Sequence, residues 1–342
     1  MKAYIKALSY YLPEKVVTNE DLVTQFPEWS VAKIISKIGI SERHIAADDE
    51  TAGDMAVKAA EKLILEYSID KSTIDYVILV TQSPDYFLPT TACIIQDKLG
   101  LPTSIGAIDV NLGCSGFIYG LSLAKGLVLG EMAENVLLLT SETYSKYIHP
   151  KDKGNRTIFG DAAAATLIST NGIAELKKFC FGTDGRGADN LIVKTGGIRH
   201  RNNLNDLVFD ASGNPKSSDY LYMDGSEILN YTLDYFPPLV VETLSKNNMD
   251  QKDIDLFVFH QANKFIMELL RKKMKIEDTK FYRYFENVGN TVSCTIPIAL
   301  KEAMNDFTIY GKSNVLLAAP GLGYSWGGAI LEFTEIHKTV CL

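Results

Sequence analysis

The chain has 342 residues, of which 46% are hydrophobic and 22% are charged, an ordinary globular composition that allows a large α/β core. Its formal net charge of −8 disfavours nucleic acid and anionic membranes as partners, so an anionic partner requires a local basic patch. The sequence contains no run of about 18 apolar residues, so no membrane-spanning helix is expected, and the first residues do not resemble a signal peptide. The cysteines are single and odd in number, which favours a cytoplasmic protein without disulfides or a metal site.

Hydrophobic patterning predicts helices and strands that alternate along the chain. In chain order, we expect a helix over 51–67, a strand over 75–81, a helix over 115–129 and a strand over 135–140. The series continues with a helix over 225–246 and strands over 255–260 and 314–319. The segment 196–220 is polar and rich in Gly, Asn and Ser, which indicates a loop.

Two segments of the first half have counterparts in the second half. Residues 59–82 resemble residues 240–261, because each has an amphipathic helix, a polar turn with Asp and an apolar strand followed by Gln. Residues 110–142 resemble residues 288–321, because each has a Gly-containing turn, a helix and the strand Asn-Val-Leu-Leu. Their common order argues against a chance likeness of two βα units. We therefore predict two similar α/β halves, 1–175 and 176–342, with mostly parallel sheets and no flexible linker between them.

Cys114 lies at the start of a predicted helix, directly after the strand AIDVN and a Gly-containing turn. The positive end of a helix macrodipole stabilises a thiolate by about 0.3–2 kcal/mol. Gly113 and Gly116 allow a tight turn, and backbone N–H groups in such a turn can bind an oxyanion. On these features alone, a small buried structural cysteine remains an alternative to a nucleophile.

His260 and Asn290 are the other two candidates for chemistry. His260 ends the strand DLFVF, at the edge where α/β sheets bind their ligands. Asn290 lies in the turn ENVGNTVSC, at the place in the second half that corresponds to Cys114. A neutral His and an Asn can both donate a hydrogen bond to a developing enolate or oxyanion. An ordinary turn residue is the alternative for Asn290, and the other four histidines lie in polar contexts typical of a surface.

The motifs DVNLGCSGF, FGDAAAATL, HQANKF, ENVGNTVSCTIPIAL and GLGYSWGGAILEF occur in one order along the chain. They resemble the motifs of the β-ketoacyl-ACP synthase III family, and with SYYLPEKVVTNEDL and SERHIA the resemblance covers essentially the whole chain. The resemblance implies a duplicated thiolase fold with αβαβα layers, a homodimer and a catalytic triad of Cys114, His260 and Asn290.

The resemblance also implies a reaction. Cys114 would attack an acyl thioester and keep the acyl group, after which malonyl-ACP would lose CO2 and attack the acyl-cysteine as an enolate held by His260 and Asn290. The N–H of Cys114 and one from the turn Gly321-Leu322-Gly323 would bind the oxyanion. The substrates would be CoA and acyl carrier protein (ACP) thioesters, and no metal or organic cofactor is expected.

The resemblance assigns contacts with the carriers to charged and polar residues: CoA or ACP contacts at Lys33, Lys37, Lys153 and Asn263, and an ACP-docking patch at Arg271, Lys272 and Lys273. Family members usually have Trp and Arg side chains around CoA, whereas lysines stand at these positions here and Trp29 lies four residues early. An acyl-ACP is therefore an alternative to an acyl-CoA as the primer. A solvated helix end is the alternative for the basic patch.

Two departures from the family pattern concern the acyl pocket. Leu88 occupies the position where a Phe of the partner subunit commonly closes the pocket, and Pro320 and Leu322 replace the more usual Phe and Gly. The length of the primer therefore stays open.

Three other classes of protein compete with a condensing enzyme. They are an acyltransferase of the same fold that passes the acyl group from Cys114 to an alcohol or amine, a cysteine hydrolase and a non-catalytic partner subunit. The repeat and the ordered motifs argue against the hydrolase, and the presence of Cys114 argues against the non-catalytic subunit. Release of CO2 from malonyl-ACP would distinguish condensation from acyl transfer.

Overall fold

The computed structural model describes residues 1–211 and 213–334. Its helices are α1 (Asn19–Gln25), α2 (Val31–Ile38), α3 (Ala52–Glu66), α4 (Thr91–Leu99), α5 (Gly116–Leu129), α6 (Lys153–Arg156), α7 (Gly225–Lys246), α8 (Lys264–Lys273) and α9 (Thr295–Asn305). The strands of the large sheet are β1 (Tyr4–Tyr11), β4 (Tyr76–Val80), β5 (Gly106–Val110), β6 (Asn135–Glu142), β7 (Ala162–Ser169), β8 (Ala174–Thr183), β13 (Leu256–Phe259), β14 (Ser313–Gly321) and β15 (Ser325–Phe333). Three small two-stranded sheets are formed by β2 (Lys15–Thr18) with β3 (Glu42–Ile45), β9 (Leu191–Ile192) with β12 (Tyr222–Met223), and β10 (Val208–Phe209) with β11 (Pro215–Lys216).

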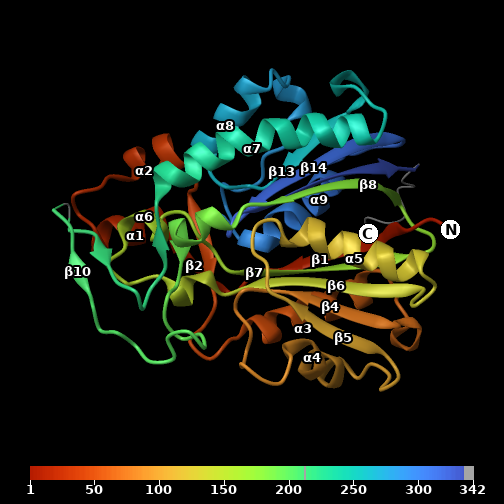
Figure 1. Cartoon of the computed structure of the whole chain (residues 1–342), viewed down its shortest axis with the longest axis horizontal. Coiled ribbons are helices and arrows are strands. Elements are labelled where there is room, and N and C mark those ends of the chain that lie inside the picture. Colours follow the sequence, from red (N-terminus) through yellow and green to blue (C-terminus); the bar gives the residue numbers. More distant parts are fainter. Residues whose placement is uncertain (212, 335–342) are drawn as a thin grey trace.

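The large sheet folds into two stacked halves. Its order is β13-β14-β15-β8-β1-β7-β6-β4-β5, but β8 and β1 share only the residue pairs Tyr4–Glu175 and Ile5–Ala174. Figure 1 shows α7 and α8 over the upper half, α5 and α9 between the halves, and α3 and α4 below the lower half. One hydrophobic cluster lies between the two halves of the sheet, around α5 and α9, and one lies between each half and its outer helices. The αβαβα layering implied by the resemblance is confirmed.

The central position of β6 and β14 explains their continuous apolar sequences. In β6, Val136 and Leu138 belong to the cluster between the sheets, whereas Leu137 and Leu139 face α3 and α4 on the other side. In β14, Val315 and Leu317 likewise face the centre, and their neighbours face α7 and α8. A strand that is buried on both faces has no polar side to alternate with, so each reads as an unbroken run of large apolar residues.

The repeat predicted from the sequence recurs in the sheet. β4 pairs in parallel with β6, and β13 pairs in parallel with β14. In each pair an aspartate accepts a hydrogen bond from the backbone of the second strand: Asp75 Oδ2 from Asn135 N at 2.9 Å, and Asp255 Oδ2 from Asn314 N at 2.8 Å. Both asparagines donate back through Nδ2, to Thr73 O at 2.9 Å and to Asp253 O at 3.0 Å. The predicted boundary between residues 175 and 176 falls inside β8.

The prediction of mostly parallel sheets is wrong. In the large sheet only β4–β5, β4–β6 and β13–β14 are parallel, and the other pairs are antiparallel. Parallel neighbours need a crossover of about a dozen residues or more. Only residues 322–324 separate β14 from β15, so this pair must be antiparallel.

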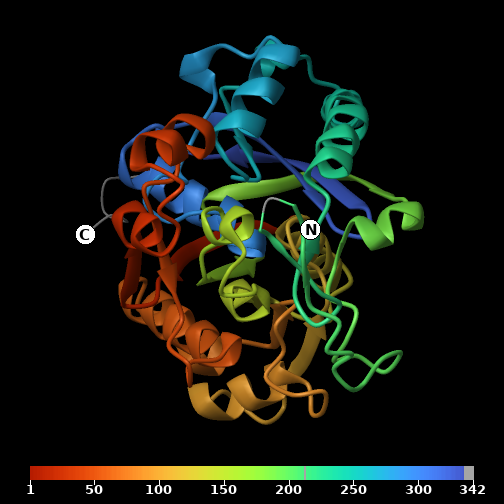
Figure 2. The ribbon, with the colours of Figure 1, turned by 90° about the vertical axis from the view of Figure 1, so that its left-hand side faces the viewer.

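One end of the layers carries most of the irregular structure. There α1, α2, α6 and the segment 196–220 lie together, at the left of Figure 1 and toward the viewer in Figure 2. Apart from β11 and β10, the described part of this segment forms no regular element, so the predicted loop is confirmed. None of the helices in residues 1–211 and 213–334 has the length and hydropathy needed to cross a bilayer.

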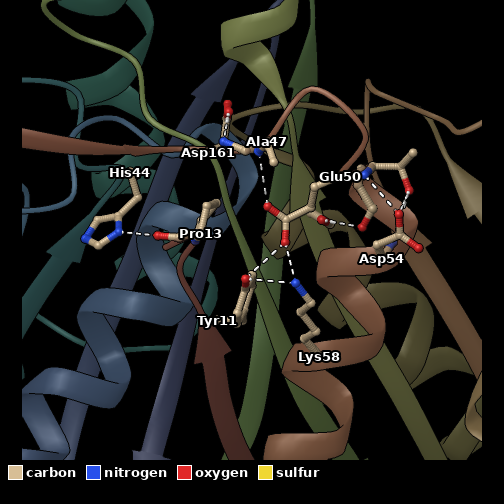
Figure 3. A network of polar contacts seen from close by, with 12 residues as sticks. Tyr11, Pro13, His44, Ala47, Glu50, Asp54, Lys58 and Asp161 are labelled. Atoms are coloured by element: carbon tan, nitrogen blue, oxygen red, sulfur yellow. Dashed lines mark hydrogen bonds and ion pairs between the residues drawn. The ribbon is translucent and has the colours of Figure 1, made fainter. Parts of the chain in front are cut away.

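A polar network fastens the start of α3 to β1. Lys58 Nζ lies 2.6 Å from Glu50 Oε1 and 3.0 Å from Tyr11 Oη, and Tyr11 donates to the same carboxylate at 3.0 Å (Figure 3). Nearby, His44 Nδ1 lies 2.6 Å from Pro13 O, so this partly buried imidazole links the loop after β1 to β3 (Figure 3). Of the other histidines expected at the surface, position 337 lies outside the described residues.

Candidate active site

Cys114, His260 and Asn290 line one cavity of about 260 Å³. Cys114 comes just before α5, His260 directly follows β13, and Asn290 precedes the short 3-10 helix Val292–Cys294 that leads into α9. The two halves of the chain therefore contribute complementary side chains to one site, at the ends of strands where α/β sheets bind ligands.

The loop that carries Cys114 packs closely on its neighbours because of its glycines. A Cβ on Gly113 would lie 2.3 Å from Gln82 Oε1, and a Cβ on Gly116 would lie 2.4 Å from Val80 Cγ1. Gly116 N donates to Gly113 O at 2.7 Å, which closes the turn around the cysteine. A side chain at either glycine would displace the sulfur from its place before α5.

The thiol of Cys114 is neutral at rest. Burial, with a smaller contribution from Glu142, raises its pKa from 9.0 to about 12. The helix macrodipole offsets at most about 2 kcal/mol, or about 1.5 in pKa. Burial therefore outweighs the helix, and the thiolate expected from the sequence forms only when a base takes the proton.

His260 is the base within reach of the cavity. Its side chain is buried, and burial lowers its pKa from 6.5 to about 3, so the imidazole is neutral near pH 7. Nδ1 lies 2.7 Å from Thr295 Oγ1, which leaves Nε2 as the ring nitrogen available to a substrate. Thr295 Oγ1 also donates to Val292 O at 3.1 Å. When the Thr295 hydroxyl donates to Val292 O, its oxygen accepts a hydrogen bond from Nδ1–H, and Nε2 carries a lone pair. When the hydroxyl instead donates to Nδ1, Nε2 carries the ring proton.

Asn290 presents its amide N–H groups to the cavity. Its Oδ1 accepts a hydrogen bond from Val292 N at 3.0 Å, so Nδ2 is the atom left to bind a ligand. The backbone is held on both sides, since Asn290 N donates to Ile158 O at 2.9 Å and Gly160 N donates to Asn290 O at 3.1 Å. Gly289 precedes it at φ +73°, a conformation that favours glycine.

The turn after β14 lies against the nucleophile loop. A Cβ on Gly321 would lie 2.3 Å from Ser115 Oγ, so only glycine allows this approach. Gly321 and Leu322 line the cavity, whereas Gly323 does not. The predicted oxyanion-binding turn is therefore beside Cys114, with its first two residues facing the cavity.

Glu142 is a buried residue of the site that the sequence analysis did not identify. It ends β6 and accepts hydrogen bonds from Gln82 N at 3.1 Å and Ser293 Oγ at 2.9 Å. Burial raises its pKa from 4.5 to about 8, so it is largely protonated near pH 7. Because Gln82 contacts the Cys114 loop and Ser293 follows Asn290, Glu142 joins the two loops that carry the site. The feature of the sequence that could have identified it is a glutamate at the end of the apolar strand β6.

Three of the residues predicted to contact CoA or ACP lie together. Lys37, Asn263 and Lys272 line a groove between α2 and α8, and Asn263 also lines the cavity of Cys114. Asn263 additionally caps α8, because its Oδ1 accepts from Ile266 N at 3.0 Å. The groove thus leads from the surface to the cavity and is lined by Lys37, Lys264 and Lys272.

The other predicted carrier contacts are engaged within the chain. Arg271 forms ion pairs with Glu268 at 3.1 Å and Asp278 at 3.4 Å. Lys273 Nζ donates to Leu233 O at 3.2 Å, and Lys153 forms an ion pair with Glu28. Lys33 Nζ lies 5.2 Å from the ring centre of Trp29, and the side chain of Leu88 is 84% exposed, away from the cavity.

Comparisons with known proteins identify the family. Residues 108–185 match the family model described as 3-Oxoacyl-[acyl-carrier-protein (ACP)] synthase III, and residues 244–333 match the model of its C terminal part. The β-ketoacyl-[acyl-carrier-protein] synthase III of Clostridium perfringens is 36% identical over 323 residues, which cover 94% of this chain and 96% of that protein. The protein of the same description from Campylobacter curvus is 35% identical over 337 residues, with 97% of each chain covered.

Solved structures agree with the sequence relatives. A crystal structure of a 3-oxoacyl-(acyl-carrier-protein) synthase III matches with a TM-score of 0.95 and 47% identity, covering 97% of this chain and all of the other. The 3-oxoacyl-(acyl-carrier protein) synthase of Burkholderia xenovorans matches with a TM-score of 0.90 and 36% identity, covering 98% and 95%. The chain belongs to the β-ketoacyl-ACP synthase III family.

Proposed function

We propose that the protein condenses an acyl thioester primer with malonyl-ACP, with loss of CO2, through an acyl group carried on Cys114. The observation that carries the proposal is the meeting of a neutral thiol, a neutral imidazole and an amide donor in one cavity. The membership in the β-ketoacyl-ACP synthase III family supports the same reaction.

In the first half-reaction, the Cys114 thiol loses its proton to Nε2 of His260 while the sulfur attacks the thioester carbonyl of the primer. The negative charge on that carbonyl oxygen is stabilised by N–H groups of the Cys114 loop and of the Gly321 turn. The carrier thiolate then leaves and takes the proton from His260, so that acyl-Cys114 and the free carrier thiol are formed.

In the second half-reaction, the malonyl thioester places its carbonyl oxygen against His260 Nε2–H and Asn290 Nδ2. The bond to the carboxylate breaks, CO2 leaves, and the electron pair forms an enolate whose oxygen accepts both hydrogen bonds. The enolate carbon attacks the carbonyl of acyl-Cys114, and the carbon–sulfur bond breaks. The Cys114 thiolate takes a proton from solvent, which balances the negative charge of the lost carboxylate, and the resting enzyme is restored.

The side chain of Thr295 supports the use of one neutral ring for both steps. Its hydroxyl can donate to Val292 O, which leaves a lone pair on Nε2 of His260 for the thiol proton. Between the half-reactions, Nε2 takes a proton from solvent and Nδ1 releases its own; the hydroxyl then donates to Nδ1, and Nε2 carries the proton that the enolate oxygen needs. The imidazole is neutral at the start of each half-reaction, in keeping with a pKa of about 3 for His260, and is charged only while it holds the proton of Cys114.

We propose that neither a metal nor an organic cofactor takes part. The thioester is already activated for attack, and loss of CO2 generates the carbon nucleophile, so the nucleophile, base and amide donor of the site are sufficient. No group of three or more His, Cys, Asp or Glu side chains in the described parts of the chain is arranged to hold a metal ion.

We propose that the protein acts as a cytoplasmic homodimer. β5 ends one side of the large sheet and therefore offers unpaired backbone groups to a second copy. Beside this half of the sheet, Tyr86, Phe87 and Leu88 expose large apolar side chains, which a second copy would cover. In such a dimer Leu88 would reach the acyl pocket of the partner. The four cysteines in the described residues are free, as a reducing compartment requires.

The carrier protein of the extender is proposed to dock beside the groove between α2 and α8. Lys37 and Lys272 supply positive charge there on an otherwise acidic protein, and an acidic carrier would be attracted to this side. The same groove accepts a CoA or ACP thioester primer.

Radiolabelled malonyl-ACP tests the reaction class. We expect CO2 release and a β-ketoacyl-ACP product in the presence of an acyl primer. Absence of CO2 release with every primer, together with transfer of the acyl group to an alcohol or amine, would instead support the acyltransferase.

A further inference from the structure

The cavity of Cys114 has one open side and two buried ends. At the open side, Gly225 and Phe265 are exposed at the starts of α7 and α8. One buried end is formed by Tyr144 and Phe159, beside Cys114. The other buried end lies between α7 and α8 and is lined by Thr232, Phe236, Ile266 and Leu270, which we call the α7–α8 arm.

The acyl chain of the primer fits the end of the cavity beside Tyr144. Cys114 packs against the hydrophobic cluster that contains Tyr144 and Phe159, and these two rings lie 5.4 Å apart between their centres. An acyl chain on the sulfur therefore finds apolar contacts in this cluster. The α7–α8 arm is then left without a role in holding the primer.

The α7–α8 arm adjoins the part of the site that holds the extender. The ring of Phe236 packs on Phe259 at 4.8 Å between centres, and Phe259 is the residue before His260. Ile266 and Leu270 belong to the helix that begins soon after His260. Pro320, on the strand that leads to the turn at Cys114, also lines the cavity, and its compact ring leaves more room than a large aromatic side chain would.

The α7–α8 arm suits an alkyl group and offers no free polar partner. Phe236 and Leu270 belong to the hydrophobic cluster on this side of the sheet. The hydroxyl of Thr232 already donates to Ile228 O at 2.7 Å, within α7. From Ile228 to Phe236 the helix rises about 12 Å, so the arm runs well past the reacting atoms.

We propose that the α7–α8 arm binds an alkyl substituent on the α-carbon of the extender, so that the enzyme uses 2-alkylmalonyl thioesters as well as malonyl thioesters. This inference rests on the proposed condensation. The bond between the α-carbon and its carboxylate breaks, CO2 leaves, and the electron pair forms the substituted enolate. That carbon bonds to the acyl carbonyl, the sulfur of Cys114 leaves and takes a proton, and the product is a 2-alkyl-3-oxoacyl thioester.

The test compares malonyl-ACP with 2-methyl-, 2-ethyl- and 2-butylmalonyl-ACP, with one primer and detection of products by mass. We expect the wild-type enzyme to form the 2-alkyl-3-oxoacyl products from all three alkylated extenders. Thr232→Leu and Leu270→Phe fill the arm, and each is expected to lower kcat/KM for 2-butylmalonyl-ACP by about 10- to 200-fold relative to malonyl-ACP. Val241→Leu is the matched control, because Val241 is exposed on α7 outside the cavity and has the shape of threonine.

Rejection of every alkylated extender by wild-type enzyme that condenses malonyl-ACP would overturn the inference and leave the proposed function intact. Failure to release CO2 from malonyl-ACP would contradict the proposed function itself. Equal losses for malonyl and alkylmalonyl extenders in folded Thr232→Leu or Leu270→Phe would also overturn the role of the arm, as would unchanged use of 2-butylmalonyl-ACP in both.

Discussion

Replacement of Thr295 by valine tests how the neutral imidazole is held. The substitution keeps the shape of the side chain but removes the hydroxyl that lies 2.7 Å from His260 Nδ1. Thr295 is buried, and the other group that hydrogen-bonds His260 is the backbone of Val292. A backbone carbonyl cannot donate a hydrogen bond, so without the hydroxyl the buried Nδ1 lone pair of the Nε2–H state has no donor, or the ring turns away from the cavity.

The size of the effect follows from the burial of both groups. A buried polar group without a partner costs about 1–3 kcal/mol. If that cost falls on the reactive orientation of His260, the rate falls by about 5- to 150-fold. Thr295→Ser keeps the hydroxyl and should retain most of the activity, since it removes only a methyl group.

Acylation and decarboxylation are measured separately for the two variants. Intact mass after a short incubation with the primer reports acyl-Cys114, and radiolabelled CO2 reports the second step. We expect Thr295→Val to slow both half-reactions, because His260 acts in both, and Thr295→Ser to restore them. Wild-type rates in folded Thr295→Val, or an equal loss in Thr295→Ser, would refute a positioning role for this hydroxyl.

Further predictions concern the pocket, the docking side and the buried carboxyl. In the proposed dimer, Leu88→Phe should narrow the partner's acyl pocket and lower kcat/KM for the longest accepted primers by about tenfold or more; an unchanged primer profile or an active monomer would contradict this. Lys272→Glu should raise KM for malonyl-ACP by about fivefold at most, the effect of losing an exposed charge pair, and should leave acylation from a CoA donor unchanged. Lys252→Glu, on an exposed turn, is the control. Equal effects of Lys272→Glu on both steps would exclude docking at α8. Because the pKa of Glu142 is raised from 4.5 to about 8 in the folded protein, the fold binds its proton more tightly and loses stability as pH rises from about 5 through 8. In urea unfolding at pH 5 to 9, Glu142→Gln should remove this loss, and equal pH slopes in both proteins would contradict it.

The layers of the fold could be predicted because the apolar runs are unambiguous. The strand expected over 135–140 corresponds to β6, and the helix expected over 225–246 corresponds to α7 with the same bounds. The direction of the strands could not be predicted from these runs, since a strand buried on both faces has the same sequence pattern in either direction. The connection between β14 and β15 is too short for a parallel crossover, so its length indicates that these two strands are antiparallel.

The candidate site was predicted in part. Cys114, His260 and Asn290 stand in motifs whose order and sequence resemble a known family, and the structure brings them into one cavity. Glu142 lies in the first half and meets Ser293 of the second half only through the packing of both halves. Thr295 lies in the motif of Asn290, but its contact with His260 depends on the fold that brings this motif to the end of β13. The state of the thiol also depends on burial, which a local helix pattern does not reveal.

The division of work among the three residues is the central claim, and separate measurement of acyl-enzyme and CO2 tests it directly. Cys114→Ala should form no acyl-enzyme but retain some decarboxylation of malonyl-ACP, because the donors of His260 and Asn290 remain. Asn290→Ala should acylate normally while condensation falls by about 10²–10³-fold, the usual effect of losing one preorganised donor. Acylation at another cysteine in Cys114→Ala, or normal condensation in Asn290→Ala, would contradict the account.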